Sequence, residues 1–309
     1  MRLLRKAEAY FSWITGKIKN IPLPVHFHIE LTNKCNLRCK FCPYREIEFT
    51  NFGFMDLKLF EKILREMKEI PEPVKVSLHL GGEPLLHPKF DWFIAKVNEE
   101  LKKMPMMATN ATLLTIDKIK KIKEAGGAWL MIVFSKNKKK FEEWRNGANW
   151  ERVKENIKNA LIHGLKIHLS CFDTAEEDIK ELFGESSNLS FSFFRLHNVG
   201  GHFAEVIEDE FGLHFERKRY FQCTHPWFGM AIAWDGKVVL CCRDVLHQHI
   251  LGDIKEQNIE EIWNGEEFQK VRYNLKIRNL DELPLCKTCS RPWEKKNQPL
   301  YILRHYIKF

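Results

Sequence analysis

The most informative absence in this sequence is a long apolar run. No stretch approaches the ~20 apolar residues that a membrane-spanning helix needs. The first twenty residues are not typical of a signal peptide, because Arg5 and Glu8 interrupt the apolar core and no small-residue cleavage site follows. We therefore expect a cytoplasmic protein, whose reduced cysteines serve metal binding or catalysis rather than disulfides.

A large excess of one sign of charge is lacking as well, since 49 Lys and Arg against 41 Asp and Glu give a net charge of +8. This excess is too small to indicate a nucleic-acid-binding surface, and no nucleic-acid partner is expected. The one dense basic run, 136–140, is interpreted as a solvated loop. Internal repeats and low-complexity linkers are also lacking, and 44% of the 309 residues are hydrophobic, which is enough for a packed core.

Apolar runs rich in β-forming residues alternate with helical patterns along most of the chain. This alternation is typical of a parallel α/β fold, which right-handed crossovers curl into a partial barrel or a doubly wound sheet. Strands are predicted over 25–31, 74–80, 105–109, 128–134, 165–171 and 189–196. Helices are predicted over 57–70, 90–103, 116–124, 150–163 and 176–183.

The pattern changes after residue 200. Asp235-Gly236 lies between two alternating segments in "GMAIAWDGKVVLCC", and this predicts a two-residue hairpin. A helix is predicted over 259–275, ahead of "CKTC" at 286–289. We therefore expect an N-terminal helical extension over 1–24, an α/β core over 25–199 and a small module over 200–309.

The N-terminal extension has a helical apolar pattern with Lys and Arg around it. We expect its apolar face to pack on the body of the protein, and a helix that lies on a membrane surface is the alternative. That face consists of Leu3, Leu4, Ala7, Tyr10, Phe11 and Ile14.

Three cysteines, Cys35, Cys39 and Cys42, lie directly after the first predicted strand. Functional sites gather at this edge of parallel α/β proteins. A structural zinc ion needs four ligands, but no fourth Cys or His follows at a suitable spacing, and His26 and His28 are interpreted as core or rim residues. Three thiolates suit a [4Fe–4S] cluster whose fourth iron stays open to another ligand.

This C-x3-C-x2-C spacing, with an aromatic residue before the last cysteine, resembles the signature of the radical S-adenosylmethionine (SAM) enzymes. The "GGEP" after the second predicted strand is similar to the SAM-binding loop of that family. Its glycines let the backbone approach a ligand, and its carboxylate can accept hydrogen bonds from an ammonium group. The resemblance implies that SAM is bound by Phe41, Gly81, Gly82, Glu83 and Pro84.

Shorter motifs extend the resemblance. The "TNA" after the third predicted strand is similar to the family's T-N-G, and "SKN" stands where many relatives have S-x-D, with Asn137 in place of the acidic residue. Arg145 resembles an arginine that helps to hold the SAM carboxylate, and hydroxyl and guanidinium groups suit a carboxylate or a ribose. Asn110, Ser135 and Arg145 are therefore added as cofactor-binding residues, with a purely structural role as the alternative for each.

A second set of cysteines lies in the C-terminal module. Cys223 and Cys241 have the spacing C-x12-G-x4-C, and with Cys286 and Cys289 they resemble the SPASM and twitch modules that bind auxiliary clusters. Because no cysteine follows Cys289, the resemblance is to the truncated twitch type, with one auxiliary [4Fe–4S] cluster. Cys242 is the alternative to Cys241, since adjacent residues of a strand point to opposite faces. A structural zinc ion is the alternative occupant of the four-thiolate set.

Several polar residues follow the fifth and sixth predicted strands. Cys171 is expected to be structural, with hydrogen-atom donation or acid–base chemistry as the alternative. Asp173, Arg195 and His197 share the same edge and are candidate substrate contacts. Cys171, Asp173 and His197 are thus the candidate catalytic residues.

The resemblance implies a partial (β/α)6 barrel of the TIM type followed by a small β-hairpin and helix module. It also implies that SAM is reductively cleaved to methionine and a 5′-deoxyadenosyl radical, with electrons from a ferredoxin or flavodoxin. Because only about 24 residues precede the first strand, we expect oxidation or epimerisation of a small polar, sugar-like or alcohol substrate. Modification of a peptide side chain is the alternative, and a non-catalytic iron–sulfur electron carrier is a further one.

Overall fold

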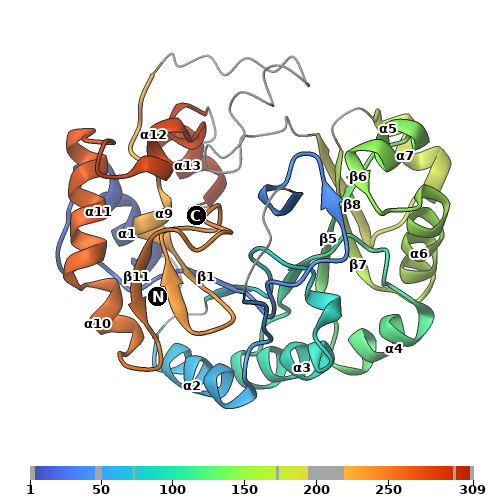
Figure 1. Ribbon diagram of the computed structural model, residues 1–309, viewed down its shortest axis with the longest axis horizontal. Coiled ribbons are helices and arrows are strands. Elements are labelled where there is room, and N and C mark those ends of the chain that lie inside the picture. The colour runs from blue at the N-terminus through green and yellow to red at the C-terminus, as the bar shows by residue number, and fades with distance from the viewer. Residues whose placement is uncertain are drawn as a thin grey trace. The chain divides into compact units, whose positions relative to one another are not determined.

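The computed structural model describes residues 4–45, 51–71, 74–171, 174–193, 219–294 and 297–306. The chain forms two compact units (Figure 1). Unit 1 combines Met1–His28, Asp56–Lys75 and His197–Phe309, and unit 2 combines Ile29–Met55 and Val76–Leu196. The predicted boundaries at residues 24 and 199 stay a prediction.

Unit 2 contains a parallel sheet with strand order β3-β4-β5-β7-β8. The strands are β3 (Lys75–Ser77), which begins at the unit boundary, β4 (Met106–Ala108), β5 (Trp129–Phe134), β7 (Lys166–Cys171) and β8 (Leu189–Phe193). The helices are α3 (Phe90–Leu101), α4 (Ile116–Glu124), α5 (Lys138–Trp144), α6 (Trp150–Ile162) and α7 (Glu176–Phe183), with short 3-10 turns η1 (Pro43–Arg45) and η2 (Pro84–Leu86). The predicted α/β alternation with a parallel sheet is therefore confirmed.

The helices of unit 2 begin where side chains can cap them. Thr115 caps α4 and Asn149 caps α6, each accepting a hydrogen bond from a backbone N–H of the first turn. Helix α6 then buries Val153 and Ile157 at a spacing of four, and each contributes about 1.5–3 kcal/mol by its burial. Helices α3, α4 and α6 lie along one side of the strands in Figure 1.

A two-residue antiparallel ladder lies outside the main sheet. It joins β2 (Arg38–Cys39) to β6 (Arg145–Asn146), with Cys39 opposite Arg145. Pairs this short give no periodic signal in the sequence, and neither strand is predicted. The ladder places Arg145 beside the first cysteine cluster.

Unit 1 contains the predicted hairpin, formed by β9 (Gly229–Ile232) and β10 (Lys237–Val239), but the register pairs Val238 with Ile232 and makes its loop three residues, 234–236, rather than two. Its strand order is β11-β10-β9-β1, with β1 (His26–Ile29) ending at the unit boundary and β11 (Ile250–Asp253) antiparallel to β10. The remaining elements are α1 (Leu4–Thr15), α2 (Leu57–Lys68), α9 (His225–Phe228), α10 (Ile259–Trp263), α11 (Glu266–Ile277), α12 (Pro284–Thr288), η4 (Arg291–Trp293) and α13 (Pro299–Tyr306). None of the helices in the described ranges is long and apolar enough to cross a bilayer.

Helix α1 forms as predicted and buries Tyr10 of the expected face, but the buried face is rotated away from Leu4, Phe11 and Ile14. Tyr10 and Trp13 are buried, and the Trp13 indole donates a hydrogen bond to the carbonyl of Gln222 at 2.8 Å. Leu4, Phe11 and Ile14, which we expected to pack, are 59%, 62% and 46% exposed. Burying two large aromatic side chains removes more apolar area from water, so the helix is rotated toward Trp13.

Two further expectations are corrected. The helix predicted over 259–275 is two helices, because the chain breaks at Gly265, where a Cβ would lie 2.7 Å from the carbonyl oxygen of Glu261. The basic run 136–140 is not a loop throughout, since Lys138 begins α5. Asn137 caps this helix by accepting from the Lys140 N–H at 2.9 Å.

A buried arginine joins three segments of unit 1. Arg272 is fully buried and donates to the carbonyls of Pro226 (2.8 Å), Trp263 (2.7 Å) and Ile18 (3.3 Å). Its guanidinium stacks on the rings of Trp263 and Phe268, 4.6 and 5.0 Å from their centroids. Burial lowers the pKa of Arg272 to about 9, so the group is still charged at neutral pH.

Replacing Arg272 with lysine tests this network. A single ammonium cannot reproduce the planar fork, so Arg272→Lys leaves at least one buried carbonyl unpaired, at about 1–3 kcal/mol for each. We expect urea unfolding to show a loss of about 2–4 kcal/mol. Arg152→Lys, on the exposed side of α6, should change stability by less than about 0.5 kcal/mol. Equal midpoints for the two variants would contradict the role of Arg272.

Candidate functional site

The first cysteine cluster is held in unit 2 by short-range contacts. Cys35, Cys39 and Cys42 are half-buried, and the Cys42 N–H donates to the Cys39 carbonyl at 3.0 Å. Burial raises the pKa of Cys35 to about 11 and of Cys42 to about 12, and the charges of the neighbouring thiols add to the shift. The three thiols therefore lie close enough to affect one another. Thiolates this close together stay ionised when they bind a positively charged metal centre.

The "GGEP" segment packs directly on the cysteine loop. A Cβ on Gly82 would lie 2.2 Å from the Thr32 carbonyl oxygen and 2.5 Å from that of Lys34. The Glu83 N–H donates to the same Lys34 carbonyl at 2.7 Å, and the Gly81 N–H donates to Glu30 at 3.0 Å. The absence of a side chain is therefore needed for the approach of two protein loops. Contact of these glycines with SAM stays a prediction.

Glu83 links three backbone segments. Its carboxylate is buried and accepts from the Thr109 hydroxyl (2.7 Å), the Asn110 N–H (2.7 Å) and the Leu85 N–H (3.1 Å). Burial raises the pKa of Glu83, while these hydrogen bonds oppose the rise. A carboxylate has about four acceptor positions, so one remains for the ammonium group predicted from the motif.

The "TNA" segment continues this network toward the cysteine loop. Asn110 donates to Asn36 at 2.9 Å, Asn36 donates to Thr112 at 2.9 Å, and Asn110 accepts from the Thr112 N–H at 2.9 Å. Ala111 has a left-handed backbone, with φ of 60°. This explains why the family prefers glycine there, because a Cβ in this conformation costs about 1–2 kcal/mol.

Arg145 offers the free donor that a carboxylate ligand requires. It is 6% exposed, lies opposite Cys39 in the β2–β6 ladder and donates through Nη1 to the Val133 carbonyl at 2.9 Å. Its buried Nε makes no hydrogen bond within the part of the chain that the structure describes. The residues present therefore fit SAM and a three-thiolate cluster.

Ser135 and Asn137 have local structural contacts. Ser135 is fully buried, its hydroxyl accepts from the Asn137 N–H at 3.1 Å, and its carbonyl accepts from the Trp150 indole at 2.7 Å. Asn137 caps α5, a position that asparagine and aspartate fill about equally well. Asn137, in place of the family's aspartate, therefore still caps the N-terminus of α5. Contact of Ser135 with SAM stays a prediction.

The candidate catalytic residues are only partly described. Cys171 is fully buried at the end of β7, on the same face as Ile167 and Leu169, which favours the structural role. Asp173, Arg195 and His197 lie outside the described residues.

A histidine on the opposite face of β7 was not among the predicted site residues. His168 Nδ1 lies 2.9 Å from the Ser190 hydroxyl, and its Nε2 lies 2.9 Å from the Ser192 hydroxyl. Burial lowers the pKa of His168, which is therefore neutral at pH 7. The alternation of "KIHLSC" could have placed His168 on the half-buried face of β7, opposite Ile167 and Leu169, but it gives no sign of the serine partners on β8.

The second cysteine set lies in unit 1. Burial raises the pKa of Cys241 well above its usual range, and the thiols of Cys242, Cys286, Cys223 and Cys289 raise it further. Burial raises the pKa of Cys242 too, and the Cys289 thiol raises it further. The interaction of Cys241 with all three other members supports it as the fourth member of the set, and ligation itself stays a prediction.

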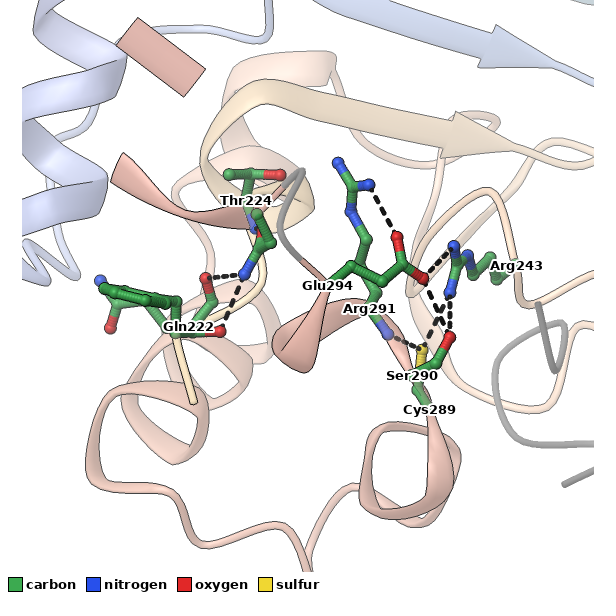
Figure 2. A network of polar contacts seen from close by, with 9 residues as sticks. Gln222, Thr224, Arg243, Cys289, Ser290, Arg291 and Glu294 are labelled. Carbon is green, nitrogen blue, oxygen red and sulfur yellow. Dashed lines mark hydrogen bonds and ion pairs between the residues drawn. The ribbon is translucent and has the colours of Figure 1, made fainter. Parts of the chain in front are cut away.

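Charged groups surround Cys289 (Figure 2). Arg243 donates to the Cys289 sulfur at 3.5 Å, and the Arg291 N–H donates to the same atom at 3.4 Å. Glu294 accepts from Arg243 at 3.1 Å and from Arg291 at 3.2 Å, which holds both guanidinium groups in place. Positive charge and N–H donors beside the sulfur suit thiolates on a cluster.

The Gly82 packing predicts a loss of SAM binding when a methyl group is added. Gly82→Ala would push the "GGEP" loop away from Thr32, because both contacting atoms belong to the backbone. We expect SAM affinity of the reconstituted protein to fall at least tenfold in equilibrium dialysis. Gly164→Ala is the control, since no atom lies within 4 Å of its added Cβ although its φ is +81°. It should reduce stability by about 1 kcal/mol and leave SAM affinity unchanged, and equal SAM affinities in the two variants would contradict this prediction.

Solved structures share this fold. BtrN in complex with AdoMet and 2-DOIA has a TM-score of 0.62 and 22% identity, covering 90% of this chain and 98% of that one. Streptococcus suis SuiB bound to precursor peptide SuiA has a TM-score of 0.60 and 19% identity, covering 92% and 74%. At these identities the similarity shows the fold.

Two relatives cover most of the sequence. S-adenosyl-L-methionine-dependent 2-deoxy-scyllo-inosamine dehydrogenase of Niallia circulans is 23% identical over 267 residues, which are 85% of this chain and 91% of that protein. Tungsten-containing aldehyde ferredoxin oxidoreductase cofactor-modifying protein of Pyrococcus furiosus is 25% identical over 316 residues, covering 86% and 87%.

Family comparison agrees with the motifs. Residues 223–290 match the iron-sulfur cluster-binding domain SPASM, and residues 29–183 match the radical SAM superfamily. The predicted cofactors, SAM and two [4Fe–4S] clusters, are those of this domain combination. The chain therefore belongs to the radical SAM superfamily.

Proposed function

We propose that this protein removes a hydrogen atom from a C–H bond of a small polar, sugar-like or alcohol substrate, leading to oxidation or epimerisation. One observation carries the proposal: the three-cysteine loop is built against the "GGEP" loop, and beside it lies the Nε of Arg145, which has no hydrogen-bond partner among the described residues. A non-catalytic electron carrier has no need of a SAM-binding loop. The relative named a 2-deoxy-scyllo-inosamine dehydrogenase supports the substrate class.

Within unit 2 the protein's contribution is to hold and orient the reactants. Cys35, Cys39 and Cys42 would ligate three irons, while Arg145 would receive the SAM carboxylate and Glu83 its ammonium group. When bound, the cluster and SAM supply a 5′-deoxyadenosyl radical. The buried network around Glu83 fixes both loops before SAM binds, so little ordering is needed at the moment of reaction.

Oxidation of an alcohol also requires a base for the hydroxyl proton, and His168 has the right protonation state. The Ser190 hydroxyl lies 2.9 Å from His168 Nδ1 and 3.4 Å from the Ile167 carbonyl. In the tautomer with the proton on Nδ1, Ser190 accepts from the ring and donates to Ile167, and the Nε2 lone pair faces Ser192. We propose that the half-buried polar face of β7 and β8 contacts the substrate hydroxyl.

A peptide substrate is the second candidate function. Relatives include Bacillus subtilis AlbA, a subtilosin biosynthesis protein, and the SuiB structure holds its precursor peptide. For either substrate, we propose an electron donor of the ferredoxin or flavodoxin type and a cytoplasmic location.

Iron content and SAM cleavage test the cofactor assignment together. Anaerobically reconstituted protein should contain about eight irons and form 5′-deoxyadenosine from SAM with dithionite. Cys35→Ala should abolish 5′-deoxyadenosine and leave about four irons, whereas Cys286→Ala should retain SAM cleavage and lose the complete reaction. Four irons and one zinc in the unaltered chain would refute the auxiliary cluster, and no 5′-deoxyadenosine would refute the enzyme.

The role of His168 predicts a pH dependence. Because burial lowers its pKa below 6.5, the neutral base persists at pH 7 and substrate oxidation should fall only when the pH drops below 6.5. His168→Gln should slow oxidation by about 10²–10⁴-fold and remove this acid limb, while SAM cleavage continues. His163→Gln, at the end of α6, should leave the pH profile unchanged. An acid limb that persists in His168→Gln would rule out this base.

A further inference from the structure

Unit 1 contains a second group of metal-ligating side chains besides the four-cysteine set. The nearest ligand atoms of His28, His225 and Cys242 all lie within 4.8 Å of one another. We propose that these three residues bind a single zinc ion, separate from the auxiliary cluster.

Three different elements bring the group together. His28 lies on β1, His225 is the first residue of α9, and Cys242 follows the end of β10. The rings of His28 and His225 have centroids 5.8 Å apart. A Cβ on Gly229 would lie 3.1 Å from Cε1 of His225, so this glycine makes room for the imidazole.

The donor atoms suit zinc. The Nε2 of His225 is buried and makes no hydrogen bond among the described residues, although a buried ring nitrogen normally has a partner. Two imidazoles and one thiolate are common zinc ligands, and at Zn–N and Zn–S lengths of about 2.1 and 2.3 Å they lie roughly 3.5 Å apart. The side chains therefore need to move inward by about 1 Å, and a fourth position stays open for water or another ligand.

Cys242 is available for this role when Cys223, Cys241, Cys286 and Cys289 ligate the auxiliary cluster, as predicted. Both adjacent cysteines interact with Cys289, but it is Cys242 whose sulfur lies within 4.8 Å of the ligand atoms of His28 and His225. The neighbouring charges of Arg243 and Arg291 are partly offset by Glu294, at 3.1 and 3.2 Å. Glu294 balances one of the two arginine charges, and a thiolate at Cys242 balances the other. The two arginines then add no net positive charge next to the zinc ion.

Zinc content distinguishes this site from the cluster. The reconstituted full chain is dialysed against zinc sulfate and analysed for both metals. We expect about one zinc beside about eight irons. His225→Ala and Cys242→Ala should each weaken zinc binding at least tenfold with iron unchanged. His26→Ala is the matched control, because His26 is on the same strand, with its ring 4.0 Å from that of His28, but is not a member of the group.

X-ray absorption at the zinc edge of the unaltered protein gives a test that does not depend on variant folding. One sulfur at about 2.3 Å and two nitrogens at about 2.1 Å support the site. A shell of four sulfurs, no bound zinc, or unchanged zinc in His225→Ala would overturn it. Loss of about four irons in Cys242→Ala would also overturn it, since Cys242 would then belong to the cluster. SAM cleavage, measured in parallel, reports separately on the proposed radical chemistry.

Discussion

The candidate SAM site depends on one buried carboxylate. Glu83 accepts hydrogen bonds from the loop after β4 and from its own loop, and its backbone N–H reaches the cysteine loop. A buried carboxylate is tolerated only when it is hydrogen-bonded, so the three segments that supply these bonds must keep their relative positions. This condition lets a short strand end, a glycine pair and a cysteine loop act as one rigid site.

The two cysteine sets differ in what surrounds them. In unit 2 the three thiols have Arg145 as a nearby charge and leave donors free for a ligand. In unit 1, Cys289 receives hydrogen bonds from Arg243 and Arg291, and Glu294 fixes these groups. Free donors, as in unit 2, would suit a site that binds a reactant. Sulfur atoms held by fixed donors, as in unit 1, would suit an enclosed site for electron transfer.

The sequence predicted the elements whose periodicity is strong and the residues whose motifs are local. Helices α4 and α7 have their predicted bounds, and Cys35 and Gly82 lie in contacting loops. The rotation of α1 was not predicted because indole burial depends on a distant carbonyl. His168 was missed because its partners, Ser190 and Ser192, belong to the neighbouring strand, and cross-strand pairing cannot be read from one segment.

The β2–β6 ladder has a consequence for oxygen damage. Cys39 and Arg145 are partners in the same short ladder, so the cysteine loop also sets the position of the guanidinium. Two paired residues are too few to persist alone, and the ladder relies on the order of the cysteine loop. If Cys39 ligates the cluster and Arg145 binds the SAM carboxylate, as proposed, oxidative loss of the cluster should also free the Arg145 side chain to move. Air would then abolish the redox centre and SAM binding together, and a damaged enzyme would not sequester SAM.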